Sequence, residues 1–138
     1  MKIRLTFCIL TFSLFLQSCG GGKASAPEFL FAAVWELEFL ADTDQGFQVL
    51  FPDITPELTF EQAAGEVVGN SGCNGYQAPY TLKGDEIRFG EPGPSTLRFC
   101  GDGENLFRKL MQQVDQWRFT DDGQLELLAD GRAVLRFR

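Results

Sequence analysis

The chain has 138 residues, with 19 acidic and 12 basic side chains and no histidine, so its formal net charge is −7. This length is enough for one domain with a sizeable hydrophobic core. The acidic balance argues against a nucleic-acid partner, because phosphate binding needs a basic face. The lack of histidine excludes a Ser-His-Asp triad and a histidine-based metal site. We therefore expect no catalytic residues, no metal and no cofactor.

Residues 1–18 have the features of a secretory signal peptide. Lys2 and Arg4 form a short basic region, and residues 5–16 are almost entirely apolar. The apolar run is too short to cross a bilayer as a helix, and small and polar residues follow it. Removal of residues 1–18 takes away two basic side chains, which leaves ten basic and nineteen acidic residues and a formal charge of −9.

The signal segment ends in Leu-Gln-Ser-Cys, from Leu16 to Cys19, and this ending resembles the lipobox of bacterial lipoproteins. The resemblance implies cleavage just before Cys19 and lipidation of its sulfur by acyl chains such as palmitate. Residues 19–33 would then form a lipidated, flexible tether. Several acyl chains hold a protein stably at a membrane, which a single chain does not. Gly20 fits outer-membrane sorting, with the domain facing the periplasm. The alternative is an ordinary signal peptide with an incidental cysteine.

Residues 34–138 are predicted to form short strands separated by glycine-rich and acidic turns. Trp35, Leu37 and Phe39 alternate with other residues and are expected on one face of the first strand. Pro79 indicates an edge or a bulge, because proline cannot donate to the ladder. Residues 47–51 are the candidate for a further short strand. The other predicted strands span residues 34–40, 57–61, 66–69, 76–83, 86–89, 116–120, 124–129 and 132–138.

One helix is predicted over residues 103–115. Asp102 is the expected N-cap, because its carboxylate can accept hydrogen bonds from the N–H groups of the first turn. The apolar face of this helix consists of Leu106, Phe107, Leu110, Met111 and Val114. The resulting fold class is α+β, mostly β: an antiparallel meander sheet or open barrel of about eight short strands with one packed helix.

Four cysteines divide into two groups. Cys8 leaves with the signal segment and Cys19 is the lipid acceptor, so Cys73 and Cys100 remain as a pair in a compartment that permits disulfides. A bond between them would add roughly 3–4 kcal/mol by the chain-entropy model. Two buried free thiols or a redox pair are the alternatives. A metal site is disfavoured, since two thiols alone make a poor zinc shell.

Four short motifs follow one another in an order found in a known family: residues 71–76 (Ser-Gly-Cys-Asn-Gly-Tyr), Ala78 with Tyr80, Thr96 with Cys100, and Glu104. This pattern resembles the META domain, the family of the HslJ-type heat-inducible lipoproteins. The likeness covers residues 34–138. The family often has Met-Ala where this chain has Arg98 and Phe99, a departure that affects loop packing and not the fold.

The motif residues have a structural and a functional interpretation. Gly72 and Gly75 would allow positive φ at a sharp bend before Tyr76, and Asn74 can bond local backbone. Cysteines 73 and 100 would tie this bend to the segment that enters the helix, where Thr96 and Glu104 belong to the same motif set. The functional alternative is a redox or ligand site. Against a redox site, the two cysteines are far apart in sequence and only Arg98 is near to lower a thiol pKa.

These observations predict a monomeric, non-enzymatic envelope lipoprotein with one META-like domain. The resemblance implies a role in stress tolerance or envelope maintenance. A first rival is an acidic inhibitor or binding module for a cationic protein such as a lysozyme, favoured by the charge of −9. A second rival is a carrier of a small apolar ligand, favoured by the 14 phenylalanines.

Overall fold

The computed structural model describes residues 26–96 and 98–138. The predicted signal segment and the predicted lipidation site, Cys19, lie outside the described residues, so both stay predictions. In the described part of the chain, no helix is both long and apolar enough to cross a membrane.

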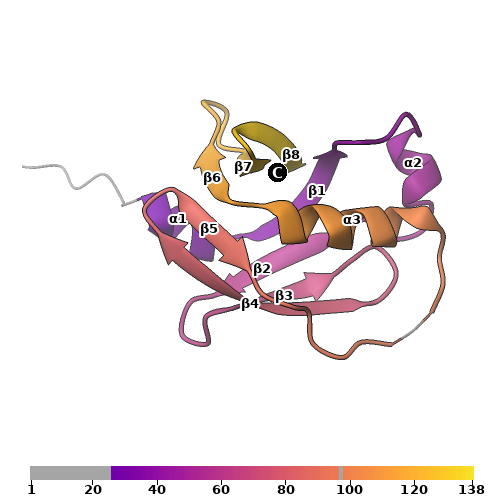
Figure 1. Ribbon diagram of the computed structural model, residues 1–138, viewed down its shortest axis with the longest axis horizontal. Helices are drawn as coiled ribbons and strands as arrows, with labels where there is room; N and C mark the ends of the chain where they lie inside the picture. The colour runs from indigo at the N-terminus through magenta and orange to yellow at the C-terminus, as the bar shows by residue number, and fades with distance from the viewer. Residues whose placement is uncertain (1–25, 97) are drawn as a thin grey trace, which may run out of the picture.

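Eight antiparallel strands make up most of the domain (Figure 1). Each strand pairs with the next along the chain, and β1 also pairs with β8, so the pairings close into a ring. The predicted mostly β meander of about eight short strands is confirmed. The strands are β1 (Val34–Leu40), β2 (Glu57–Glu61), β3 (Glu66–Asn70), β4 (Gly75–Lys83), β5 (Glu86–Phe89), β6 (Gln116–Phe119), β7 (Leu125–Ala129) and β8 (Arg132–Phe137).

Alternation of apolar and polar residues gives most strands one buried face. In β5, for example, Ile87 and Phe89 are buried while their neighbours are exposed. Strand β1 breaks the expected alternation: Trp35 and Leu37 are buried, but Phe39 is 39% exposed. The reason is a register shift between Leu37 and Phe39 where β1 pairs with β8, which turns the side chains after it to the other face.

Strand β4 pairs with two neighbours in succession. Its first half, to Pro79, pairs with β3, and its second half, from Tyr80, pairs with β5. Pro79 lies at this change of partner, where its carbonyl accepts a hydrogen bond from the N–H of Gly90 at 2.8 Å. The expected edge or bulge at Pro79 is therefore wrong. The missing N–H is tolerated because the pairing passes from one neighbour to the other there.

The main helix, α3 (Asp102–Gln113), lies close to the predicted position and packs against β5 and β8 (Figure 1). Three of its own side chains, Phe107, Leu110 and Met111, are fully buried in the core. The expected N-cap is wrong: Asp102 is already the first helical residue, Gly101 occupies the cap position, and no side chain caps the helix.

Two short helices fall where the sequence predicted none. Helix α1 (Ala26–Phe31) belongs to the folded domain, because Leu30 is fully buried and its carbonyl accepts the indole N–H of Trp35 at 2.9 Å. The flexible tether predicted over residues 19–33 is therefore too long, because its C-terminal part, which contains α1, belongs to the folded domain. Helix α2 (Phe47–Leu50) replaces the candidate short strand. The four-residue spacing of Phe47 and Phe51 favours a helical turn over a strand, because it puts both rings on one side of the turn, with centroids 5.2 Å apart.

Candidate functional site

The motif residues meet at the bend between β3 and β4. The N–H of Ser71 donates to the carbonyl of Asn74 at 2.9 Å, which closes the bend. Gly72 has φ +93°, and a Cβ there would lie 2.4 Å from the Phe51 ring, so glycine is required on two counts. The expected positive φ at Gly75 is wrong: Gly75 is extended as the first residue of β4, and space around it is open.

Asn74 is the centre of the site and is 95% buried, with 5% of its surface exposed. Its amide nitrogen donates to the carbonyl of Arg98 and to Oε2 of Glu104, both at 2.7 Å. Its amide oxygen accepts from the N–H of Arg98 at 3.1 Å and from the hydroxyl of Thr96 at 2.9 Å. Both N–H groups and both lone pairs of the amide are therefore used, and the amide orientation is fixed by the Arg98 backbone.

Glu104 connects this bend to the first turn of α3. One carboxylate oxygen accepts from Asn74, and the other accepts from the hydroxyl of the fully buried Ser71. A carboxylate at this end of a helix is also favoured by the helix dipole. Arg108, one turn further along, has its guanidinium 3.8 Å from Glu104. The early acidic residue of the motif thus holds the bend against the helix.

The disulfide between Cys73 and Cys100 makes the third connection. The Cα atoms lie 5.8 Å apart across a sequence separation of 27 residues. The alternative of two free thiols is not what the structure shows. Thr96 and Arg98 are accordingly held to the bend by hydrogen bonds to Asn74, and Cys100 is held to it by a covalent bond.

Tyr76 packs beneath α3 and is almost completely buried. Its ring makes an edge contact with Phe107, with centroids 5.6 Å apart, and the Arg108 guanidinium lies 5.7 Å from its centroid. Burial raises the pKa of Tyr76 to about 12, although Arg108 acts in the opposite direction. Its hydroxyl has no hydrogen-bond partner among the described residues. Tyr76 is therefore a neutral core residue over the whole physiological pH range.

A pocket of about 300 Å³ opens beside this cluster. Its wall contains both buried members of the cluster and exposed side chains from the loop before α3. The lining residues are Asn74, Ser95, Arg98, Phe99, Glu104, Asn105 and Arg108.

A second polar cluster lies outside the motif, on the outer face of β6, β7 and β8. Glu126 is buried between Arg118 and Arg136, with nitrogen–oxygen distances of 2.6 and 2.8 Å. Burial raises the pKa of the Glu126 carboxyl, but hydrogen bonds and charge from the two arginines outweigh burial and lower it below its usual range. The cluster joins three strands and is structural.

Comparison with known proteins agrees with this arrangement. The family model of the META domain matches residues 29–138, which is most of the chain. The chain belongs to the META domain family. Its fold is similar to that of a protein from Burkholderia xenovorans solved by NMR, with a TM-score of 0.56 and 25% identity over 81% of this chain and 84% of that one. No curated protein matches the chain.

The META motif residues therefore meet in one place. Cys73, Asn74, Thr96, Cys100 and Glu104 are linked directly, whereas Gly72 and Tyr76 support them from the side. Sequence reasoning placed Ser71 in the motif but gave it no role, and it did not predict that Asn74 binds the backbone of Arg98. Within residues 26–96 and 98–138, no group of three or more cysteine, aspartate or glutamate side chains is placed to hold a metal ion.

Proposed function

We propose that this chain is a lipid-anchored envelope protein whose META domain acts without catalysis, in stress tolerance or envelope maintenance. The observation that carries the proposal is the saturation of the motif cluster. Asn74 uses all its hydrogen-bonding capacity internally, and both cysteines are in a disulfide. The two hydroxyls of the cluster, on Ser71 and Thr96, donate to Glu104 and Asn74 within it, so its chemistry supports a scaffold and not a reaction centre.

The anchor is supported by the sequence at the N-terminus. The lipobox-like ending places the acceptor at Cys19, and helix α1 of the domain begins at Ala26. Seven peptide units can span at most about 25 Å. A lipid at Cys19 would therefore keep the domain close to the membrane surface, and Gly20 supports an outer-membrane location facing the periplasm.

Metabolic labelling tests the anchor. Cells expressing the full chain are fed a clickable palmitate analogue, and incorporation is compared among wild type, Cys19→Ser and the matched control Cys8→Ser. We expect label and membrane fractionation for wild type and Cys8→Ser, and loss of both for Cys19→Ser. Equal labelling of the Cys19→Ser protein would reject lipidation at this residue.

A cellular assay tests the proposed role. Strains carrying wild type or the unanchored Cys19→Ser protein are compared with the deletion strain for survival of heat and envelope stress. Rescue by the anchored protein alone supports envelope maintenance, and wild-type survival of the deletion strain under every stress would refute it.

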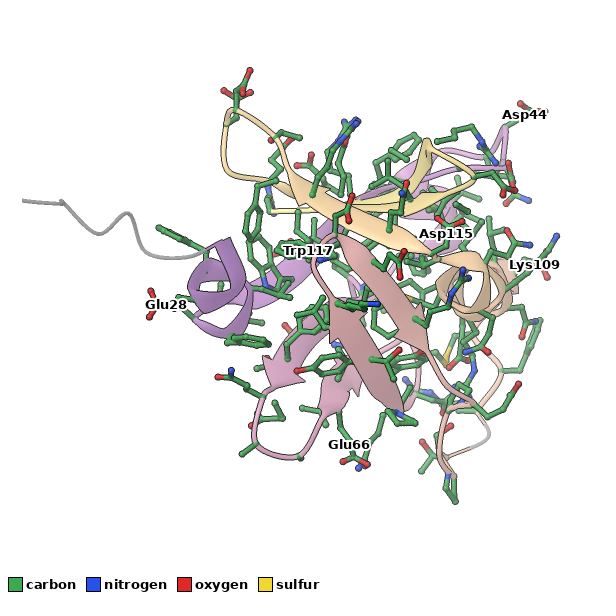
Figure 2. The ribbon with its side chains drawn as sticks, turned by 60° about the vertical axis from the view of Figure 1, so that its left-hand side comes forward. Glu28, Asp44, Glu66, Lys109, Asp115 and Trp117 are labelled. Atoms are coloured by element: carbon green, nitrogen blue, oxygen red, sulfur yellow. A yellow bond between two sulfur atoms is a disulfide. The ribbon has the colours of Figure 1, made fainter. Side chains whose placement is uncertain are left out.

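A second candidate, a binding module for a cationic protein, is favoured by the outer face of β2 and β3. Glu57, Glu61 and Glu66 project there, and Glu61 lies directly opposite Glu66 in the ladder. Among the described residues, none of the three forms an ion pair; Figure 2 shows Glu66 projecting away from the ribbon. Like charges held opposite each other weaken a sheet, and a cationic partner would offset that.

Binding to lysozyme at low and high salt tests this candidate. Glu61→Gln should weaken binding, and Glu36→Gln, which removes a carboxylate already paired with Arg138 at 2.7 Å, should weaken it less. No binding at low salt would refute it. The carrier of an apolar ligand receives less support, because large side chains such as Phe60, Phe137 and Leu127 fill the interior of the ring.

A further inference from the structure

The motif cluster fixes a short segment whose side chains play no part in the cluster. Asn74 binds both the N–H and the carbonyl of Arg98, at 3.1 and 2.7 Å. The disulfide holds Cys100 two residues later. The backbone around Phe99 is therefore ordered when the protein folds, and a ligand that binds there need not supply that ordering.

The two side chains that this backbone presents, Arg98 and Phe99, are exposed. Phe99 is 78% exposed, the highest value among the exposed large hydrophobic residues of the described chain. Arg98 makes no ion pair with any described carboxylate, whereas five other arginines do. An exposed aromatic ring beside an uncompensated guanidinium, on a fixed backbone, is the composition of a binding hot spot.

The adjacent pocket has the opposite charge to the domain as a whole. Its lining residues include two arginines, Arg98 and Arg108, and one acidic residue, Glu104, in a chain with a net charge of −7. Arg108 is already oriented by the Tyr76 ring and by Glu104. Both carboxylate oxygens of Glu104 are engaged by Ser71 and Asn74. With two arginines against one carboxylate, the net charge of the lining residues is positive, and an apolar ring lies beside them, so the complementary group is an anion that carries an apolar substituent.

A groove adjoins this pocket at Ser95, which lines both. The groove has a volume of about 460 Å³, and its lining residues include Gly69, Gly75, Gln77 and Thr96. Nothing lies within 4 Å of where a Cβ of Gly75 would be. An open, glycine-containing groove leading into a small charged pocket suits an extended chain better than a compact free acid.

We propose that this pocket binds the free C-terminus of a peptide or protein chain that ends in an apolar residue. Arg98 and Arg108 bind the terminal carboxylate through charge-assisted hydrogen bonds, Phe99 covers the last side chain, and the preceding residues lie in the groove. The inference does not depend on the lipid anchor.

Fluorescence anisotropy with the full mature protein in detergent tests the proposal. The probe is an N-terminally labelled hexapeptide that ends in phenylalanine with a free carboxylate, and its partner is the same peptide with an amidated end. We expect saturable binding of the free acid, at least about tenfold weaker binding of the amide, and weakening by salt. Equal binding of acid and amide, or no binding of either, would overturn the proposal.

Matched variants assign the effect to the pocket. Arg98→Gln should weaken binding of the free acid about tenfold, while Arg88→Gln, on an exposed arginine of β5 that also makes no ion pair with a described carboxylate, should leave it unchanged. Phe99→Ser should weaken it, and Val49→Ser, at a side chain 69% exposed on α2, should not. Loss of binding in all four variants would overturn the assignment to this pocket.

The same carboxylate chemistry could come from a free fatty acid, so hexadecanoate is added as a competitor. Failure of hexadecanoate to displace the peptide is expected. Displacement that is tighter than peptide binding and is lost in Arg98→Gln would assign the pocket to a fatty acid and overturn the peptide assignment. Melting temperatures of all variants should match wild type, because none of the replaced side chains supports the core.

Discussion

Replacing Asn74 by alanine removes four hydrogen bonds at once. Three join neutral groups, and the fourth joins the amide to the Glu104 carboxylate. Neutral bonds contribute about 1 kcal/mol each and bonds to charged groups about 1.5–3 kcal/mol. The simple total is about 5 kcal/mol, but Thr96 and Arg98 are near solvent and recover water when the amide is gone. We therefore expect Asn74→Ala to lower the free energy of unfolding by about 3 kcal/mol.

Urea unfolding of the oxidised mature protein, followed by tryptophan fluorescence, measures this loss. Asn105→Ala is the matched control: Asn105 is an exposed amide on α3, and its substitution should change stability by less than about 0.5 kcal/mol. Thr96→Val removes a single bond of the same cluster and should cost about 1 kcal/mol. A loss below about 1 kcal/mol for Asn74→Ala would refute the conclusion that this amide holds the bend, the loop and the helix together.

Three further predictions concern the disulfide, the buried carboxylate and the bend. Serine at Cys73 and Cys100 together should lower the free energy of unfolding by roughly 3–4 kcal/mol, and an unchanged urea midpoint would contradict the role of the bond as a constraint. The pKa of Glu126 is lowered in the folded state, so its stabilising effect is complete above the ordinary glutamate pKa and is lost as pH falls through the folded value. Glu126→Gln should accordingly flatten the acid side of the stability–pH curve, and an unaltered curve would contradict this. Gly72→Ala should destabilise by about 1–3 kcal/mol because of positive φ and the Phe51 ring, whereas Gly75→Ala should be nearly neutral; equal effects in thermal melts would be inconsistent with the bend geometry.

The strand order could be predicted because alternation and turn residues are local signals. The face on which Phe39 lies could not be predicted, because a register shift in β1 reverses the alternation after Leu37. No residue type at that point of the sequence indicates the shift. Helix α2 was also missed, because residues 47–51, with four apolar side chains among five, fit one helical turn as well as a short strand. Its position is set by tertiary packing of Leu50 and Phe51.

The members of the motif cluster could be named from the sequence, but their bonds could not. Asn74 meets Thr96 and Glu104 across 22 and 30 residues, and only the fold brings them together. Ser71 was recognised as part of the motif without a role, because a serine that bonds a distant carboxylate looks like any turn serine. The use of Arg98 through its backbone is invisible in sequence, since any residue type supplies the same N–H and carbonyl.

The most direct test of the central claim is peptide mass spectrometry of the protein purified from the cell envelope without reductant. We expect one N-terminal peptide that begins with acylated Cys19 and one linked pair of peptides joined through Cys73 and Cys100. Together these would establish a lipid-anchored domain with a closed, non-reactive motif. An unacylated N-terminus would contradict the anchor, and free thiols at both cysteines would contradict the structural role assigned to the cluster.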